Sequence, residues 1–165
     1  IQIGYRGVTQ SVPEVLAQTR SSASQDPAEL IRVIAAHLLS PHFSDIYPSY
    51  PAFSRLSQPI SESARPTSAL DAARFIARGM RTNLAIGVMN GLQLLDDQER
   101  IKPLRSPYAR YFLEKLQAKG PNQVVNQGEV LTMVAGGVDQ PIYKDTHFQL
   151  EPEWVAVSLL ALVYD

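Results

Sequence analysis

The sequence predicts a mainly α-helical fold, with a short N-terminal β hairpin and a C-terminal winged-helix-like unit of three helices. Apolar residues recur three or four positions apart through most of the chain, and helix start signals precede these runs. Alternation with a period of two is confined to the first residues, too few to form a sheet by themselves. We find no internal repeat of fixed length and no low-complexity tract.

The first 40 residues predict a hairpin followed by two helices. Residues 1–9 alternate apolar and polar side chains around Gly7, which predicts a short strand or hairpin. Ser11 and Glu14 have the spacing of a capping box, so a short helix is expected over 12–19. A stronger helix begins with Asp26 as N-cap and Pro27 at its first position, and we expect it to stop at Ser40 and Pro41.

Residues 41–66 contain five prolines among aromatic and aliphatic residues. The prolines break regular structure, but a solvated linker would not carry so many large apolar groups. We therefore expect an ordered, irregular crossing. The run from Tyr47 to Pro51 has two readings, as a proline-rich ligand or peptide-docking surface, or as an anchor of the crossing onto the helices. We favour the anchor.

The centre of the chain predicts two helices and a polar corner. Ser68 and Asp71 repeat the capping pattern, and the apolar spacing carries a helix to about Arg81. A second helix is expected over 83–95, followed by the corner at 96–98.

The last third predicts helix, short strand, helix, helix, which is the winged-helix order. Ser106 caps a helix that ends near Lys119, and Val124 and Val125 form the strand stub. Asn126 caps a second helix ending at Gly136, and the third runs from Pro152 to Tyr164. This divides the chain into a helical domain, 1–100, and a winged-helix-like unit, 101–165, that stops where a wing would begin.

Composition excludes several classes of protein. The 165 residues carry 15 basic and 16 acidic side chains, a net charge of −1, and no cysteine. A disulfide scaffold, a zinc ribbon and a thiol nucleophile are therefore excluded, as is a uniformly basic nucleic-acid binder. No apolar run reaches the roughly 20 residues of a membrane span.

Catalytic motifs are also missing. The sequence has neither a phosphate-binding glycine loop followed by Lys and Ser or Thr nor a Gly-x-Ser-x-Gly elbow, and no cofactor is predicted. Gly87 and Gly91 lie at helical spacing, and close packing explains them better than ligand binding. We assign no catalytic, cofactor-binding or metal-binding residue to this segment and expect it not to be an enzyme.

Histidine and tryptophan residues have a structural and a functional reading. His37, His42 and Asp45 suggest a metal site, but a separation of five is wrong for one helix face. A histidine near a helix C-terminus and a loop residue are the simpler interpretation. His147 is expected in a solvated loop. Trp154 could anchor an interface, but a lone tryptophan in a helix like this one is expected in the core.

Arg74, Arg78 and Arg81 follow at i, i+4 and i+7, which would align three guanidinium groups along one helix face. Such a face can contact phosphate or an acidic partner, or it can simply be solvated. Net charges are 0 for residues 1–60, +4 for 61–120 and −5 for 121–165. This asymmetry favours docking to complementary protein surfaces over wrapping DNA.

One stretch carries a family resemblance. The run Leu-Glu-Pro-Glu-Trp-Val-Ala-Val at 150–157, with the apolar residues after it, resembles a segment of the large bacterial phage-defence ATPases of the BREX and phage growth limitation systems, the PglY/BrxC-like proteins. The sequence over 106–126 and around Pro41, His42 and Phe43 is similar to the same region of these proteins. The family's ATPase motifs lie outside this chain, so the resemblance supplies no active-site residue. It implies an accessory segment of a multidomain, cytoplasmic, ATP-dependent antiviral protein.

These observations lead to two hypotheses of different class. The first is a non-catalytic interaction or assembly module that contacts other domains of the parent protein or other defence-system proteins. The alternative is a nucleic-acid-binding module whose Arg74, Arg78 and Arg81 face touches phosphates. The last helix begins with Glu151 and Glu153 rather than basic residues, so we expect it to be buried instead of entering a DNA groove. No membrane partner is predicted.

Overall fold

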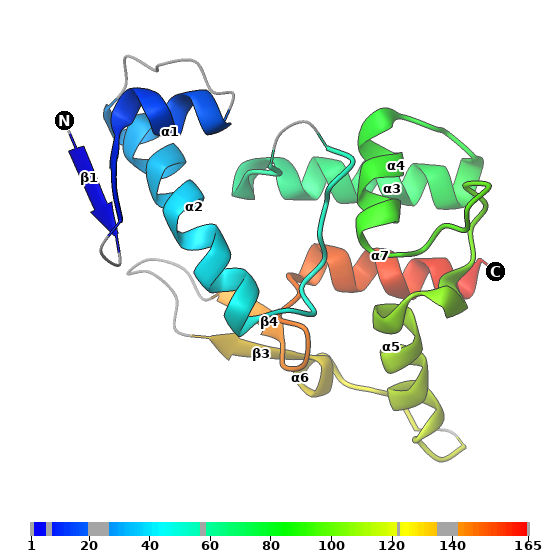
Figure 1. Cartoon of the computed structure of the whole chain (residues 1–165). Helices are drawn as coiled ribbons and strands as arrows, with labels where there is room; N and C mark the ends of the chain where they lie inside the picture. Colours follow the sequence, from blue (N-terminus) through cyan, green and yellow to red (C-terminus); the bar gives the residue numbers. More distant parts are fainter. Residues whose placement is uncertain are drawn as a thin grey trace. The chain divides into compact units, whose positions relative to one another are not determined.

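The structure is a computed structural model that describes residues 2–5, 8–19, 27–56, 59–121, 123–134 and 142–164 (Figure 1). The chain forms two compact units, Ile1–Pro48 and Ser49–Asp165, and each is described by itself. This division differs from the boundary predicted after residue 100. Residues on both sides of that position belong to one tight turn, in which Leu95 pairs with Ile101 and the Lys102 N–H donates to the Leu94 carbonyl at 2.8 Å.

The first unit begins with the predicted hairpin. β1 (Gln2–Tyr5) pairs antiparallel with β2 (Val8–Ser11). Helix α1 follows at once over Val12–Thr19, as its capping box predicted. The Ser11 N–H and hydroxyl both donate to the Glu14 carboxylate, at 2.7 and 2.8 Å, and the backbone donor lowers the pKa of Glu14.

Helix α2 runs over Pro27–Ile46, so the predicted stop at Ser40 and Pro41 is wrong. A proline inside a helix removes one backbone donor, but it leaves the following N–H groups able to continue the ladder. The Tyr47 N–H still reaches the Phe43 carbonyl at 2.8 Å, and the two rings contact each other. The helix ends just before the Tyr47–Pro48 pair, where the residue preceding proline avoids the helical conformation. The predicted cap Asp26 lies outside the described residues.

The second unit starts with the part of the crossing that follows Pro48, and two helices come after it. A short 3-10 turn, η1 (Glu62–Ala64), leads into α3 (Arg65–Arg78), and α4 covers Asn83–Gly91. Both helices are confirmed, but the cap predicted at Ser68 is wrong. Ser68 is buried inside α3, where its hydroxyl donates to the Ala64 carbonyl at 2.7 Å. The α4 helix ends at Gly91 instead of continuing to 95, and the polar corner at 96–98 follows.

The predicted helix at Ser106 is confirmed as α5 (Pro107–Gln117), after the 3-10 turn η2 (Pro103–Arg105). The Ser106 side chain accepts from the Ala109 N–H at 3.3 Å and donates to the Leu92 carbonyl at 2.7 Å. One buried hydroxyl therefore caps α5 and joins it to the end of α4.

The prediction of a second helix in the winged-helix-like unit is wrong. The capping box of Asn126 and Glu129 is present, but α6 (Gln127–Val130) is a single turn. It leads directly into β3 (Leu131–Val134), which pairs antiparallel with β4 (Ile142–Asp145). The stub predicted at Val124 and Val125 has no strand structure. A hairpin thus stands where a helix was expected, because the pairing of distant strands outweighs a weak local helix preference.

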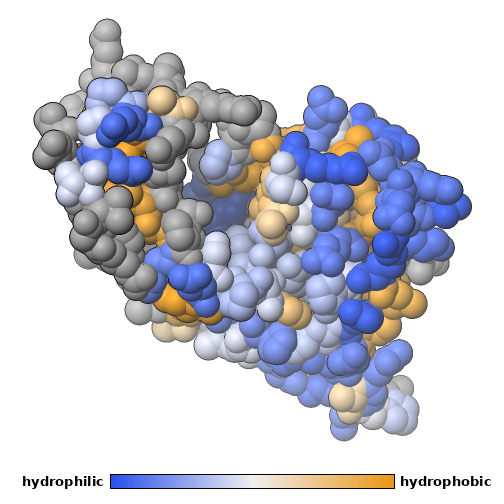
Figure 2. All heavy atoms as spheres, in the orientation of Figure 1, coloured by the Kyte–Doolittle hydropathy of each residue, from blue (hydrophilic) through white to orange (hydrophobic). Residues whose placement is uncertain are grey.

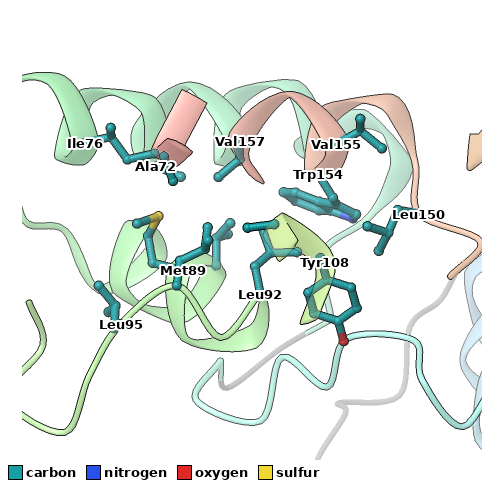
Figure 3. Close-up of a cluster of buried hydrophobic side chains, with 14 of the residues drawn as sticks. Ala72, Ile76, Met89, Leu92, Leu95, Tyr108, Leu150, Trp154, Val155 and Val157 are labelled. Carbon is teal, nitrogen blue, oxygen red and sulfur yellow. The ribbon is translucent and has the colours of Figure 1, made fainter. Parts of the chain in front are cut away.

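The core of the second unit surrounds α7 (Pro152–Val163), which confirms the last predicted helix. Trp154 is only 1% exposed and its ring contacts that of Phe53, so its core interpretation is confirmed. In Figure 3, Trp154 and Val157 of α7 point toward Leu92 and Met89 at the end of α4. Side chains from α3, α4, α5 and α7 complete this core; among them are Ala72, Phe75, Val88, Tyr108, Phe112 and Ala161.

Candidate functional site

The predicted basic face is only partly formed. Arg74 and Arg78 lie on α3, but the helix ends at Arg78 because Gly79 adopts the left-handed conformation with φ 67°. Arg81 therefore lies in the turn before α4, and the expectation of three arginines on one helix face is wrong. Its guanidinium carbon sits 5.4 Å from the centre of the Phe75 ring, a cation–π arrangement.

Two of the three arginines pair with carboxylates of the chain itself. Arg74 contacts Asp71 at 3.3 Å, and the other oxygen of Asp71 accepts from the Thr82 hydroxyl at 3.2 Å. Arg81 forms an ion pair with Glu99. Arg78 is exposed and has no ion pair with any residue that the structure describes.

Glu99 joins Arg81 to a fourth arginine that the sequence analysis did not single out. Its second oxygen accepts from Arg55 at 2.9 Å, so one carboxylate serves two guanidinium groups 44 and 18 residues away in sequence. The side chains are 36% exposed for Glu99, 48% for Arg55 and 46% for Arg81. The Arg55, Glu99 and Arg81 group, called here the arginine clamp, carries a net positive charge at a solvated surface.

The turn that presents Glu99 is built by Asp96. One oxygen of the Asp96 carboxylate accepts from the backbone N–H groups of Gln98 and Arg100, both at 2.9 Å. The Arg100 N–H is the main reason why the pKa of Asp96 is lowered. Glu99 itself has φ 57°, in the left-handed region that favours glycine.

A groove of about 750 Å³ opens beside the arginine clamp. Half-buried aliphatic side chains from the crossing and from α4 form its apolar lining, and Arg55 and Glu99 lie on its polar side. This volume is in the range of small-ligand sites. The apolar lining consists mainly of Leu56, Ile60, Leu84 and Ile86.

Two glycines allow the crossing to lie against α4. A Cβ atom at Gly87 would overlap the Leu56 side chain, and one at Gly91 would overlap the Phe53 ring. Close packing is therefore confirmed as the reason for this pair, although the neighbour is the crossing and not another helix. Leu56 forms part of the groove lining, so Gly87 also shapes the groove.

A second shared carboxylate, Glu151, lies at the start of α7. It accepts from the Tyr50 hydroxyl at 2.8 Å and lies 3.4 Å from Arg65 and 3.6 Å from Lys144. Its side chain is 12% exposed. Burial, followed by the nearby Glu151 charge, raises the pKa of Tyr50. Tyr50 therefore anchors the part of the crossing after Pro48 to the start of α7, as predicted, while the sequence carried no signal for its partners.

The histidines supply no metal site among the residues that the structure describes. His37, His42 and Asp45 all lie on α2, and within the described ranges no three His, Cys, Asp or Glu residues cluster for a metal ion. His42 lies on this helix and not in a loop, so its interpretation as a loop residue is wrong. His147 is exposed in the turn after β4, as predicted, but its ring stacks on Tyr111 with centroids 4.8 Å apart. The buried Asp145 holds this turn by accepting from the His147, Phe148 and Leu150 backbones.

The amino-acid sequence matches one protein-family model. The match covers residues 65–165, from the start of α3 through α7, and the model is described as the fourth domain of DUF6079, a family of unknown function. The chain belongs to this family. No curated protein and no solved structure matches it.

The DUF6079 match includes Arg74, Arg78, Arg81, Glu99 and Glu151, whereas Arg55 and Leu56 precede it. Within the described ranges, no helix is both long and apolar enough to cross a membrane.

Proposed function

We propose that this chain is a non-catalytic interaction and assembly module of a bacterial phage-defence ATPase of the BREX or phage growth limitation type, similar to PglY and BrxC. The parent protein would hydrolyse ATP in the cytoplasm. This segment would hold other domains of that protein, or other proteins of the defence system, in place. The description of the matched model as a fourth domain supports a multidomain parent.

The observation that carries this proposal is the pairing of the basic face with carboxylates of the chain itself. Arg74 and Arg81 are already engaged by Asp71 and Glu99, so two of the three predicted phosphate contacts would first have to break an ion pair. The α7 helix, which a DNA-binding winged helix would place in the major groove, has Trp154, Val155 and Val157 buried in the core.

The proposal is tested in the parent protein by deleting the segment that corresponds to this chain. We expect the purified deletion protein to hydrolyse ATP at a rate close to that of the intact protein, while it no longer co-purifies with its defence-system partners and no longer protects cells from phage. Loss of hydrolysis together with intact partner binding would overturn the proposal, because the segment would then serve the catalytic cycle.

A nucleic-acid-binding module remains the second candidate, and one observation favours it. Arg78 is exposed and forms no ion pair with a described residue, in a segment of net charge +4. Phosphate contacts weaken steeply with salt. Fluorescence anisotropy of a labelled 20-base-pair duplex at 50 and 200 mM salt separates the two functions. DNA binding would fall strongly with salt and with Arg78→Ala, whereas the assembly module is expected to show no binding at either salt concentration.

A further inference from the structure

The groove beside the arginine clamp has two sides of different chemistry. Leu56 and Ile60 of the crossing and Leu84 and Ile86 of α4 provide an aliphatic lining, and all four side chains are half-buried in the free chain. An occupant with a large aliphatic side chain would remove this surface from water, which is the main favourable term in protein association. Among the described residues, the lining contains no aromatic ring on which a nucleic-acid base would stack.

The other side of the groove is lined by one arginine and one glutamate, Arg55 and Glu99, and the arginine clamp to which they belong has a net positive charge. Arg55 and Arg81 share the single carboxylate of Glu99, and all three side chains remain between about a third and a half exposed. A guanidinium group has five donors, so Arg55 can donate to a second carboxylate beside Glu99 or exchange one carboxylate for the other. Charge complementarity therefore selects an anionic group next to the aliphatic one.

The backbone conformation of Glu99 also indicates a binding site at this groove. Its φ of 57° is a conformation that glycine adopts easily and that is strained for residues with a side chain. Exposed ion pairs of this kind contribute little to folding stability. The side chain is thus held in a strained turn without a comparable gain in stability, and such outliers cluster at binding sites.

We propose that this groove binds a short peptide segment of a partner protein in which a large aliphatic side chain lies next to a carboxylate. The aliphatic side chain fills the space between Leu56 and Leu84, and the peptide carboxylate binds Arg55 while Glu99 keeps Arg81. Glu99 then acts as a built-in competitor that weakens binding of other anions. The inference rests on the proposed function, since it names the contact through which the interaction module recognises its partner.

The test uses a displayed library of random dodecapeptides selected on the full 165-residue chain. We expect the enriched peptides to carry Leu, Ile or Met adjacent to Asp or Glu, and synthetic fluorescent copies to bind in anisotropy titrations. Arg55→Gln is expected to weaken binding about three- to tenfold, the range for losing one charged contact. Arg74→Gln is the matched control, because Arg74 is 49% exposed, pairs with one carboxylate and lies outside the groove.

Glu99→Gln is expected to have the opposite effect and to tighten binding about two- to fivefold, because it removes the competing carboxylate. Misfolding cannot mimic this gain, and circular dichroism checks the fold of each variant. Three results would overturn the proposal: no enrichment of a peptide class, enrichment of basic peptides, or equal binding by the Arg55→Gln and Arg74→Gln variants. Displacement of the peptides by the duplex DNA would likewise overturn it, because a nucleic acid would then be the occupant.

The outcomes also separate this inference from the proposed function. If the parent protein loses its partners when the segment is deleted but Arg55→Gln leaves them bound, the interaction module stands and the groove assignment fails. If the deletion leaves every partner bound, the proposed function fails, whether or not the selected peptides bind the groove.

Discussion

Glu151 and Glu99 are each shared between two cationic side chains, but they lie in different environments. Glu151 is 12% exposed and also accepts from the Tyr50 hydroxyl, so it joins the crossing to α3, β4 and α7. Glu99 is 36% exposed and lies in a strained turn beside an open groove. Burial makes the first carboxylate important for the fold, whereas solvent leaves the second available for exchange with another anion.

The sharpest test of this comparison is Glu151→Gln. The substitution leaves Arg65 and Lys144 partly buried without their shared counter-charge. We expect a loss of about 2 to 3 kcal/mol in the free energy of unfolding, below the roughly 3 to 5 kcal/mol of a fully buried pair. Urea unfolding followed by circular dichroism measures it.

Glu153→Gln is the matched control on the same turn of α7, because Glu153 forms no ion pair with any residue in the described ranges. An equal effect of the two substitutions would contradict the structural role of Glu151.

The next largest effect is expected from Gly91→Ala. The added methyl group overlaps the Phe53 ring, which packs on Trp154, so the crossing must shift. We expect a loss of about 2 kcal/mol, typical of overpacking a core.

Gly128→Ala is the control for this variant, since no atom lies within 4 Å of its Cβ position and α6 tolerates alanine. It is expected to raise stability by up to about 1 kcal/mol. Unfolding midpoints that fall equally in both variants would show that backbone effects, and not the contact with Phe53, are responsible.

Alkaline pH is expected to lower the free energy of unfolding, because two tyrosine hydroxyls are partly buried in the second unit. Burial raises the pKa of Tyr108 to about 12 and also raises that of Tyr50. The folded chain therefore keeps these protons when the unfolded chain has begun to release them near pH 10, and stability that is complete below pH 10 falls as pH rises toward 12. A loss of about 1 kcal/mol for each of the two tyrosines is expected by pH 11.

Urea unfolding at pH 8 and pH 11 measures this loss. The double variant Tyr50→Phe with Tyr108→Phe is expected to show a smaller difference between the two pH values. The same difference in the double variant and the unmodified chain would contradict the assignment.

The smallest change in stability is expected from Glu99→Gly. Glycine relieves the left-handed backbone strain, while the loss of two exposed ion pairs costs little. We expect the free energy of unfolding to stay within about 0.5 kcal/mol of the original value. A loss as large as that from Glu151→Gln would erase the distinction between the two carboxylates.

The sequence by itself determined most of the helices, because their start signals are local. Ser11 with Glu14, Ser106 with Pro107 and the Glu-Pro-Glu run before Trp154 begin α1, α5 and α7 at the expected positions. Each signal lies within four residues of the helix start: Ser11 and Ser106 pair with nearby groups, and Pro152 favours the first turn of α7, so no tertiary contact was needed to read it. The burial of Trp154 and the close approach at Gly91 followed from the apolar content of their helices.

Only the tertiary structure decided the features that depend on distant partners. The segment Leu131–Val134 is a strand because Ile142–Asp145 pairs with it, in spite of a capping box directly before it. Tyr50 and Glu151 are 101 residues apart, and Arg55 and Glu99 are 44 apart. Spacing along a chain reports contacts between neighbouring turns of a helix or adjacent strand residues, and it carries no information about which distant side chains the packed core brings together.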